Sequence, residues 1–136
     1  MPHSARNDRL KFDMFPKPLP EDRTEHALVN GIRTYGEVLR HVAFSNQYAA
    51  DCLNGATAED TSNELPPAQY STKTSALAAL QRSSAAVGVA LRGRKTSPDP
   101  KTTERIVTFP EHTSEHYGQL VVYSRLMGIV PGTSRG

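Results

Sequence analysis

Two histidines near the C-terminal end of the chain have the spacing of a metal-binding pair. His112 and His116 lie four positions apart at the head of an apolar run, within the stretch Glu111-His-Thr-Ser-Glu-His-Tyr117. On a helix, such positions are stacked neighbours whose Cβ atoms lie about 5–6 Å apart. Two imidazoles placed in this way can converge on one ion. Any chemistry of this protein is therefore expected here first.

His41 is the expected third ligand of that ion. It shares a helix face with Phe44 and Tyr48, whereas Arg40 and Asp51 fall on the polar strip of the same segment. Because the first face is apolar, His41 is expected to point inward. Taken alone, it is better explained as a core histidine that is hydrogen-bonded to a neighbour. Helix bundles, however, build metal sites from side chains on facing helices, so a three-histidine site is the favoured interpretation.

The same C-terminal stretch also has the His-x-x-Glu-His order of the inverted zinc peptidases, in which Glu115 would be the general base. Those enzymes need a third, acidic ligand downstream, and no Asp or Glu follows His116. We therefore reject the peptidase interpretation. Glu115 and Tyr117 lie off the stripe that the two histidines share, and neither is assigned a catalytic role.

The remaining histidines and the single cysteine are not expected to join this site. Cys52 would lie about 16 Å from His41 along the same helix, so the two cannot share an ion. It is expected to be a small buried apolar group. His3 and His26 occupy irregular segments and are expected to be exposed to solvent.

Three segments have helical periodicity: residues 34–55, 71–92 and 102–127. In the first, Thr34 and Glu37 match the capping box that begins a helix. In the third, Pro110 lies inside the periodic segment. Either that helix is kinked at the proline, or Thr108 caps a helix whose first turn contains it.

The N-terminal segment, residues 1–33, is irregular. Residues 7–15 are compatible with a short helix, which Pro16, Pro18 and Pro20 would stop. We therefore expect an all-α fold in which residues 34–136 form the helical domain.

Bulk properties exclude several classes of protein. The formal net charge of the 136 residues is only +2 and the basic residues are scattered, so no nucleic-acid partner is expected. A single cysteine rules out an internal disulfide and fits a reducing compartment. No apolar run approaches the length of a membrane span, and the N-terminus lacks a hydrophobic signal core. A cytoplasmic protein that contacts neither membrane nor nucleic acid is expected.

Two blocks of the chain, residues 33–43 around His41 and residues 112–131, resemble the DinB-like (YfiT-like) superfamily of four-helix-bundle metalloenzymes. The match covers about residues 30–136. It implies an up-down-up-down four-helix bundle with a short or incomplete first helix. It also implies that His41, His112 and His116 bind a divalent metal, with Zn or Ni favoured and Fe or Mn as alternatives.

Relatives of this kind include thiol S-transferases that use low-molecular-weight thiols, so the resemblance implies a metal-dependent transferase or hydrolase. The metal would activate a water or a small thiol. Two alternatives stay open. One is a non-catalytic metal-binding bundle of the stress response, which could be a homodimer. The other is a truncated, inactive member, since the family has a full first helix where this chain has three prolines.

Overall fold

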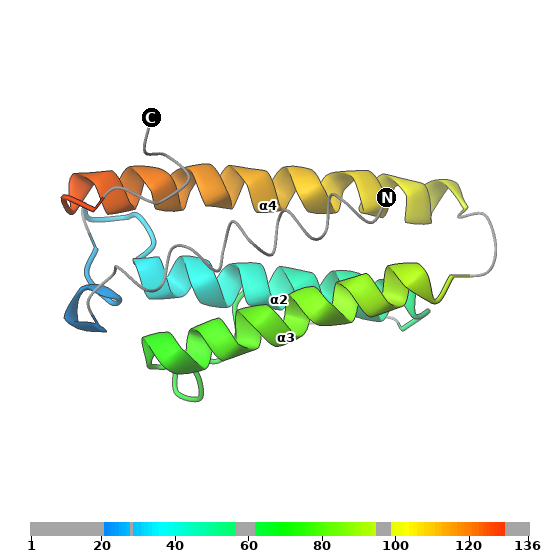
Figure 1. The fold of residues 1–136 in the computed structure, drawn as a ribbon, viewed down its shortest axis with the longest axis horizontal. Coiled ribbons are helices and arrows are strands. Elements are labelled where there is room, and N and C mark those ends of the chain that lie inside the picture. The colour runs from blue at the N-terminus through cyan, green and yellow to red at the C-terminus, as the bar shows by residue number, and fades with distance from the viewer. Residues whose placement is uncertain (1–20, 28, 57–61, 95–98, 130–136) are drawn as a thin grey trace.

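The computed structural model describes residues 21–27, 29–56, 62–94 and 99–129. These residues form a short 3-10 helix, η1 (Glu21–Arg23), and three long helices, α2 (Tyr35–Leu53), α3 (Lys73–Arg92) and α4 (Pro100–Leu126) (Figure 1). No strand occurs among them, so the all-α prediction is confirmed. A fourth long helix is not found in the described part of the chain. The short helix considered for residues 7–15 lies outside the described residues.

Helix α2 has the bounds that its sequence predicted. The hydroxyl of Thr34 accepts a hydrogen bond from the backbone N–H of Glu37, and the Glu37 carboxylate accepts one from the N–H of Thr34. This reciprocal capping box fixes the start of the helix. Asn54 caps its C-terminal end, and Gly55 follows in the left-handed conformation with φ 85°.

Helices α3 and α4 differ slightly from their predicted bounds. Helix α3 begins after Thr72, whose side chain caps the N–H of Ser75, two residues later than expected. Helix α4 begins two residues earlier than expected, because Asp99 caps it and Pro100 occupies the first turn, where the missing N–H costs nothing. Pro110 lies inside one continuous helix. The alternative in which Thr108 starts a new helix is therefore wrong.

The up-down-up-down order of helices is wrong as well. Helices α2 and α3 run in the same direction and α4 runs opposite to both (Figure 1). The packing agrees with this, since Asn46 near the middle of α2 hydrogen-bonds Ser83 near the middle of α3, while Ala50 further along α2 clusters with Val87. Parallel neighbours require a connection that returns along the length of a helix, about 28 Å for α2. The long segment between Leu53 and Lys73 is that connection.

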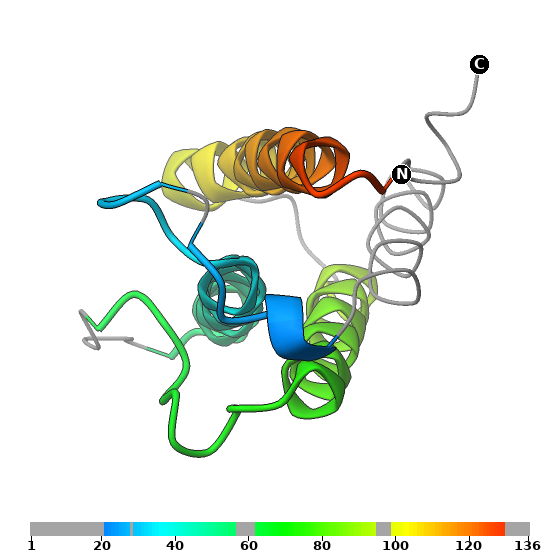
Figure 2. The same cartoon turned by 90° about the vertical axis from the view of Figure 1, so that its left-hand side faces the viewer.

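The core lies along α2, which packs against α3 on one side and α4 on the other (Figure 2). Helices α3 and α4 make few contacts with each other. The main cluster joins apolar residues of all three helices: Tyr35, Val38, Leu39, Val42, Ala43, Ala76, Ala79, Leu80, Leu120 and Tyr123. The central position of α2 explains why it carries most of the fully buried side chains.

Large apolar side chains remain exposed on the two outer helices. Val89 on α3 and Val107, Val122 and Leu126 on α4 are all more than half exposed. Within the described ranges, none of the helices combines the length and the apolar character that a membrane span requires.

Candidate metal centre

Three histidines from two helices meet between α2 and α4. Nε2 of His41 on α2 lies 3.0 Å from Nε2 of His112 on α4, although the two residues are 71 positions apart in the sequence. One turn along α4, Nε2 of His116 lies 3.1 Å from the same His112 atom. Within the described residues, these three form the group of potential ligands that could hold a metal ion. The sequence predicted all three.

Two of the three separations between the nitrogens fit one ion, and all three ligand atoms lie within 4.8 Å of one another. Two imidazole nitrogens, each about 2.0–2.1 Å from a zinc ion, are about 3.3 Å apart at the tetrahedral angle and about 2.9 Å apart at a right angle. The separations of 3.0 and 3.1 Å fall inside this interval. The rings are steeply inclined to one another, with interplanar angles of 64°, 76° and 71°. The three rings therefore meet edge to face and are not stacked.

Two of the rings are held in the tautomer that a metal requires. Nδ1 of His41 lies 2.7 Å from the backbone carbonyl of Asn63, which can only accept, so Nδ1 carries the proton. Nδ1 of His116 lies 2.9 Å from Oε1 of Gln119, whose amide nitrogen donates to the hydroxyl of Tyr123 at 2.8 Å. In its neutral form, each of these two rings therefore presents a bare Nε2 to the centre. Ligating histidines commonly donate their second N–H in this way.

With all three rings neutral, the centre has more nitrogen lone pairs than N–H donors to satisfy them. The bare Nε2 atoms of His41 and His116 both face Nε2 of His112, which can carry one proton and donate it well to only one of them. A divalent cation at the same point would accept all three lone pairs. The donor set thus fits a metal better than it fits a hydrogen-bond network.

The connection between α2 and α3 positions the carbonyl that orients His41. On its return along α2, the backbone N–H of Leu65 donates to the carbonyl of Arg40 at 3.4 Å, and the Arg40 guanidinium binds the Glu64 carboxylate at 2.6 Å. Asn63 adopts a left-handed backbone conformation with φ 61°, which asparagine tolerates better than most residues. Two consecutive residues of α2 therefore bind two consecutive residues of the connection: Arg40 binds Glu64, and His41 binds Asn63.

Arg40 itself lies where the sequence did not place it. It was expected on the polar strip of α2, but only 3% of its side chain is exposed. Its guanidinium also forms two hydrogen bonds to Glu25, at 2.6 and 3.2 Å, and donates to the carbonyl of Tyr70. The long side chain thus places its guanidinium beyond the helix surface, where two carboxylates and one backbone carbonyl bind it. Gln47 and Asp51, which bond each other on the helix surface, do follow the predicted strip.

Gly36 gives the Glu25 carboxylate room to reach Arg40. A Cβ at position 36 would clash with Oε1 of Glu25 and lie 3.1 Å from the Arg40 guanidinium. The backbone N–H of Gly36 also donates to the carbonyl of Thr24 at 2.7 Å. These contacts therefore hold the segment before α2 against the helix, between one and two turns from His41 and the candidate metal centre.

Burial favours the neutral form of two of the candidate ligands, His112 and His41. The pKa of His112 is lowered to about 4, chiefly by burial and to a smaller extent by the neighbouring His116 and His41. Burial also lowers the pKa of His41, although the hydrogen bond to Asn63 opposes the shift. Because metal ligation needs the neutral imidazole, both shifts favour a ligand-competent state at neutral pH.

Other residues considered from the sequence lie outside this centre. Glu115 is exposed and Tyr117 packs at the edge of the core. His26 is exposed, as expected. Cys52 is partly buried and is not part of the histidine group. His3 lies outside the described residues.

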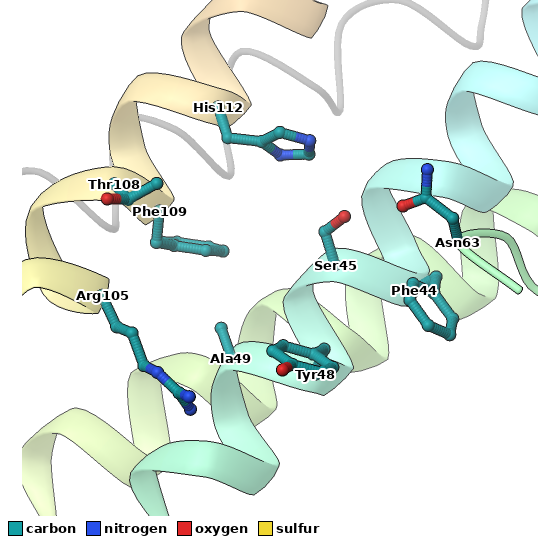
Figure 3. Close-up of a pocket in the computed structure, with 9 residues that line it drawn as sticks. All are labelled: Phe44, Ser45, Tyr48, Ala49, Asn63, Arg105, Thr108, Phe109 and His112. Atoms are coloured by element: carbon teal, nitrogen blue, oxygen red, sulfur yellow. The ribbon is translucent and has the colours of Figure 1, made fainter. Parts of the chain in front are cut away.

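A groove of about 460 Å³ opens next to the three histidines (Figure 3). His112 and Asn63 border it, and its walls are formed by α2 on one side and α4 on the other. Its volume falls in the range of small-molecule sites. The groove gives a ligand direct access to the histidine that stands between the other two.

Sequence reasoning missed three contributors to the site. The spacing of Gln119, three positions after His116, placed it within reach on a helix and could have been noticed. Asn63 contributes through its backbone carbonyl, which every residue has, so its residue type could not reveal this role. The importance of Arg40 depends on two carboxylates that lie far from it in sequence, and no local pattern shows this.

The chain matches no model of a known protein family, no curated protein and no solved structure.

Proposed function

We propose that this chain is a DinB-like metal-binding protein in which His41, His112 and His116 hold one divalent transition metal, Zn or Ni by preference. The observation that carries the proposal is the convergence of three Nε2 atoms, two of them on rings whose Nδ1 is already bonded. Imidazole donors also suit Fe, and Mn is a weaker option. The resemblance of two sequence blocks to the DinB-like superfamily supports the same ligand set.

We propose further that the site is catalytic, as a metal-dependent transferase or hydrolase. When bound, such an ion supplies Lewis-acid activation, which makes a water or a small thiol nucleophilic at neutral pH. The protein's own part is to supply three neutral ligands, which leave the ion's charge uncompensated, and to leave a coordination position open. The adjoining groove gives a second reactant a place beside His112.

An activity screen tests this reaction class. The metal-loaded protein is incubated with chlorodinitrobenzene and cysteine as a small thiol, and separately with nitrophenyl acetate for hydrolysis. Turnover above the uncatalysed rate is expected in at least one assay, with loss of turnover after chelation and in His112→Ala. Rates that are equal for the metal-loaded and chelated protein would contradict a metal-dependent enzyme.

A non-catalytic metal-binding bundle is the second candidate function. The exposed apolar side chains on α3 and α4 favour it, because such surface suits a homodimer better than an isolated enzyme. Stoichiometric metal binding without turnover in either assay, together with a dimeric mass in solution, would support this candidate. Failure to bind any divalent metal would instead indicate a truncated, inactive member.

A further inference from the structure

The groove beside the histidines has two chemically different ends. Its upper end is formed by His112 and Asn63, and the guanidinium of Arg105 lies at the other end (Figure 3). Arg105 precedes His112 by about two turns of α4, so the two side chains originate about 10 Å apart along the helix. A ligand that spans the groove would contact both.

The middle of the groove is apolar and aromatic. Phe109 projects from α4 between the two ends, and Phe44 and Tyr48 project from α2 (Figure 3). The rings of Phe44 and Tyr48 stack with their centroids 6.5 Å apart. Aromatic walls of this kind favour an apolar or aromatic ligand, because they bind it without demanding hydrogen bonds.

The charge of Arg105 is not neutralised by the described residues. Its guanidinium lies 5.9 Å from the centroid of the Tyr48 ring, and it forms no ion pair with any carboxylate in the described part of the chain. Asp99 borders the neighbouring pocket together with Arg105, but its carboxylate accepts from the backbone N–H and the hydroxyl of Thr102, at 2.9 and 2.7 Å. The planar donor fork of an arginine that has no carboxylate partner among the described residues is well suited to the carboxylate of a ligand.

We propose that the groove binds an elongated apolar molecule that ends in a single carboxylate. The carboxylate is bound by Arg105, the apolar body lies between Phe109 and Tyr48, and the opposite end is presented at His112. The statement that this opposite end is the reacting end rests on the proposed function. The binding mode itself depends only on the groove.

A matched pair of ligands tests this binding mode. Phenylhexanoate and the neutral alcohol phenylhexanol share an apolar body and differ in the charge. Calorimetric titration of the full chain is expected to show about tenfold tighter binding of the carboxylate, since one charge-assisted hydrogen bond is worth at least that factor. In Arg105→Met the carboxylate should bind no better than the alcohol, and Arg105→Lys should retain part of the preference. Phe109→Ala should weaken both ligands by a similar factor.

Controls separate this inference from the metal proposal. Arg82→Met removes an exposed arginine of α3 that does not line the groove and should leave both affinities unchanged. Each titration is repeated with metal-loaded and chelated protein. A carboxylate preference that persists after chelation and disappears in Arg105→Met supports the groove, even for a protein that binds no metal. Equal affinity for both ligands, or a preference that survives in Arg105→Met, would overturn it.

Discussion

Nδ1 of His41 and the backbone carbonyl oxygen of Asn63 lie 2.7 Å apart, across the contact between α2 and the segment that returns to α3. This bond fixes the tautomer of His41 and aims its Nε2 at the other two histidines. Because the carbonyl belongs to a residue with φ 61°, the orientation of a ligand depends on one unusual backbone conformation.

Replacing Asn63 should therefore change metal affinity according to backbone preference. Asn63→Val disfavours the left-handed conformation and should move the carbonyl away from His41. We expect metal affinity to fall about tenfold, because the loss of a hydrogen bond that orients a metal ligand typically costs at least that factor. Asn63→Gly keeps the conformation accessible and is the matched control. Competition titrations against a chromogenic chelator measure both. Identical affinities for the two variants would show that the carbonyl does not orient His41.

Gly36→Ala should destabilise the fold even though alanine is the better helix former. The new Cβ displaces Glu25 from Arg40, and the lost charge-assisted hydrogen bonds outweigh the gain of about 1 kcal/mol in helix propensity. We expect a net loss of about 1 kcal/mol in the free energy of unfolding, measured by urea denaturation.

Gly118→Ala is the control for that experiment. Gly118 lies exposed on α4 with no atom within 4 Å of an added Cβ, so this variant should be more stable by about 0.5–1 kcal/mol. In a Glu25→Ala background, Gly36→Ala should also become stabilising. If Gly36→Ala stabilises the otherwise unchanged protein as much as Gly118→Ala does, the contact between Glu25 and Arg40 has no energetic role.

The metal-free protein should lose stability on acidification because His112 is a partly buried, neutral ring. Its folded pKa is lowered from 6.5 to about 4, so the unfolded chain binds more protons between these values. Stability is therefore retained above about pH 6.5 and lost as the pH falls toward 4. Urea midpoints of the wild type and of His112→Gln measure this, and the variant should show a weaker dependence. An NMR titration midpoint for His112 at or above 6.5 would be incompatible with it.

The sequence was sufficient for features that depend on neighbouring residues. The start of α2 followed from Thr34 and Glu37, because a capping box involves only neighbouring residues. The convergence of His112 and His116 followed from helix geometry, since residues four apart necessarily share a face. His41 followed from the apolar face around it, which indicated that it is buried.

Features that depend on distant segments could not be predicted in this way. The parallel arrangement of α2 and α3 is set by how the connection between them crosses back, and periodicity alone carries no direction. The burial of Arg40 was missed because its partners, Glu25 and Glu64, lie 15 and 24 positions away. A charged residue on a helix normally lies on the solvent side. Arg40 can be buried because both carboxylates pair with it.

Metal content of the purified protein tests the central claim most directly. After loading with zinc and removal of excess metal, elemental analysis is expected to find about one equivalent per chain, because the three ligands form one site. His41→Ala, His112→Ala and His116→Ala should each lose most of that metal while keeping a helical circular dichroism spectrum. His26→Ala removes an exposed histidine and should bind as the wild type does. Equal metal content in all five proteins would contradict the three-histidine site.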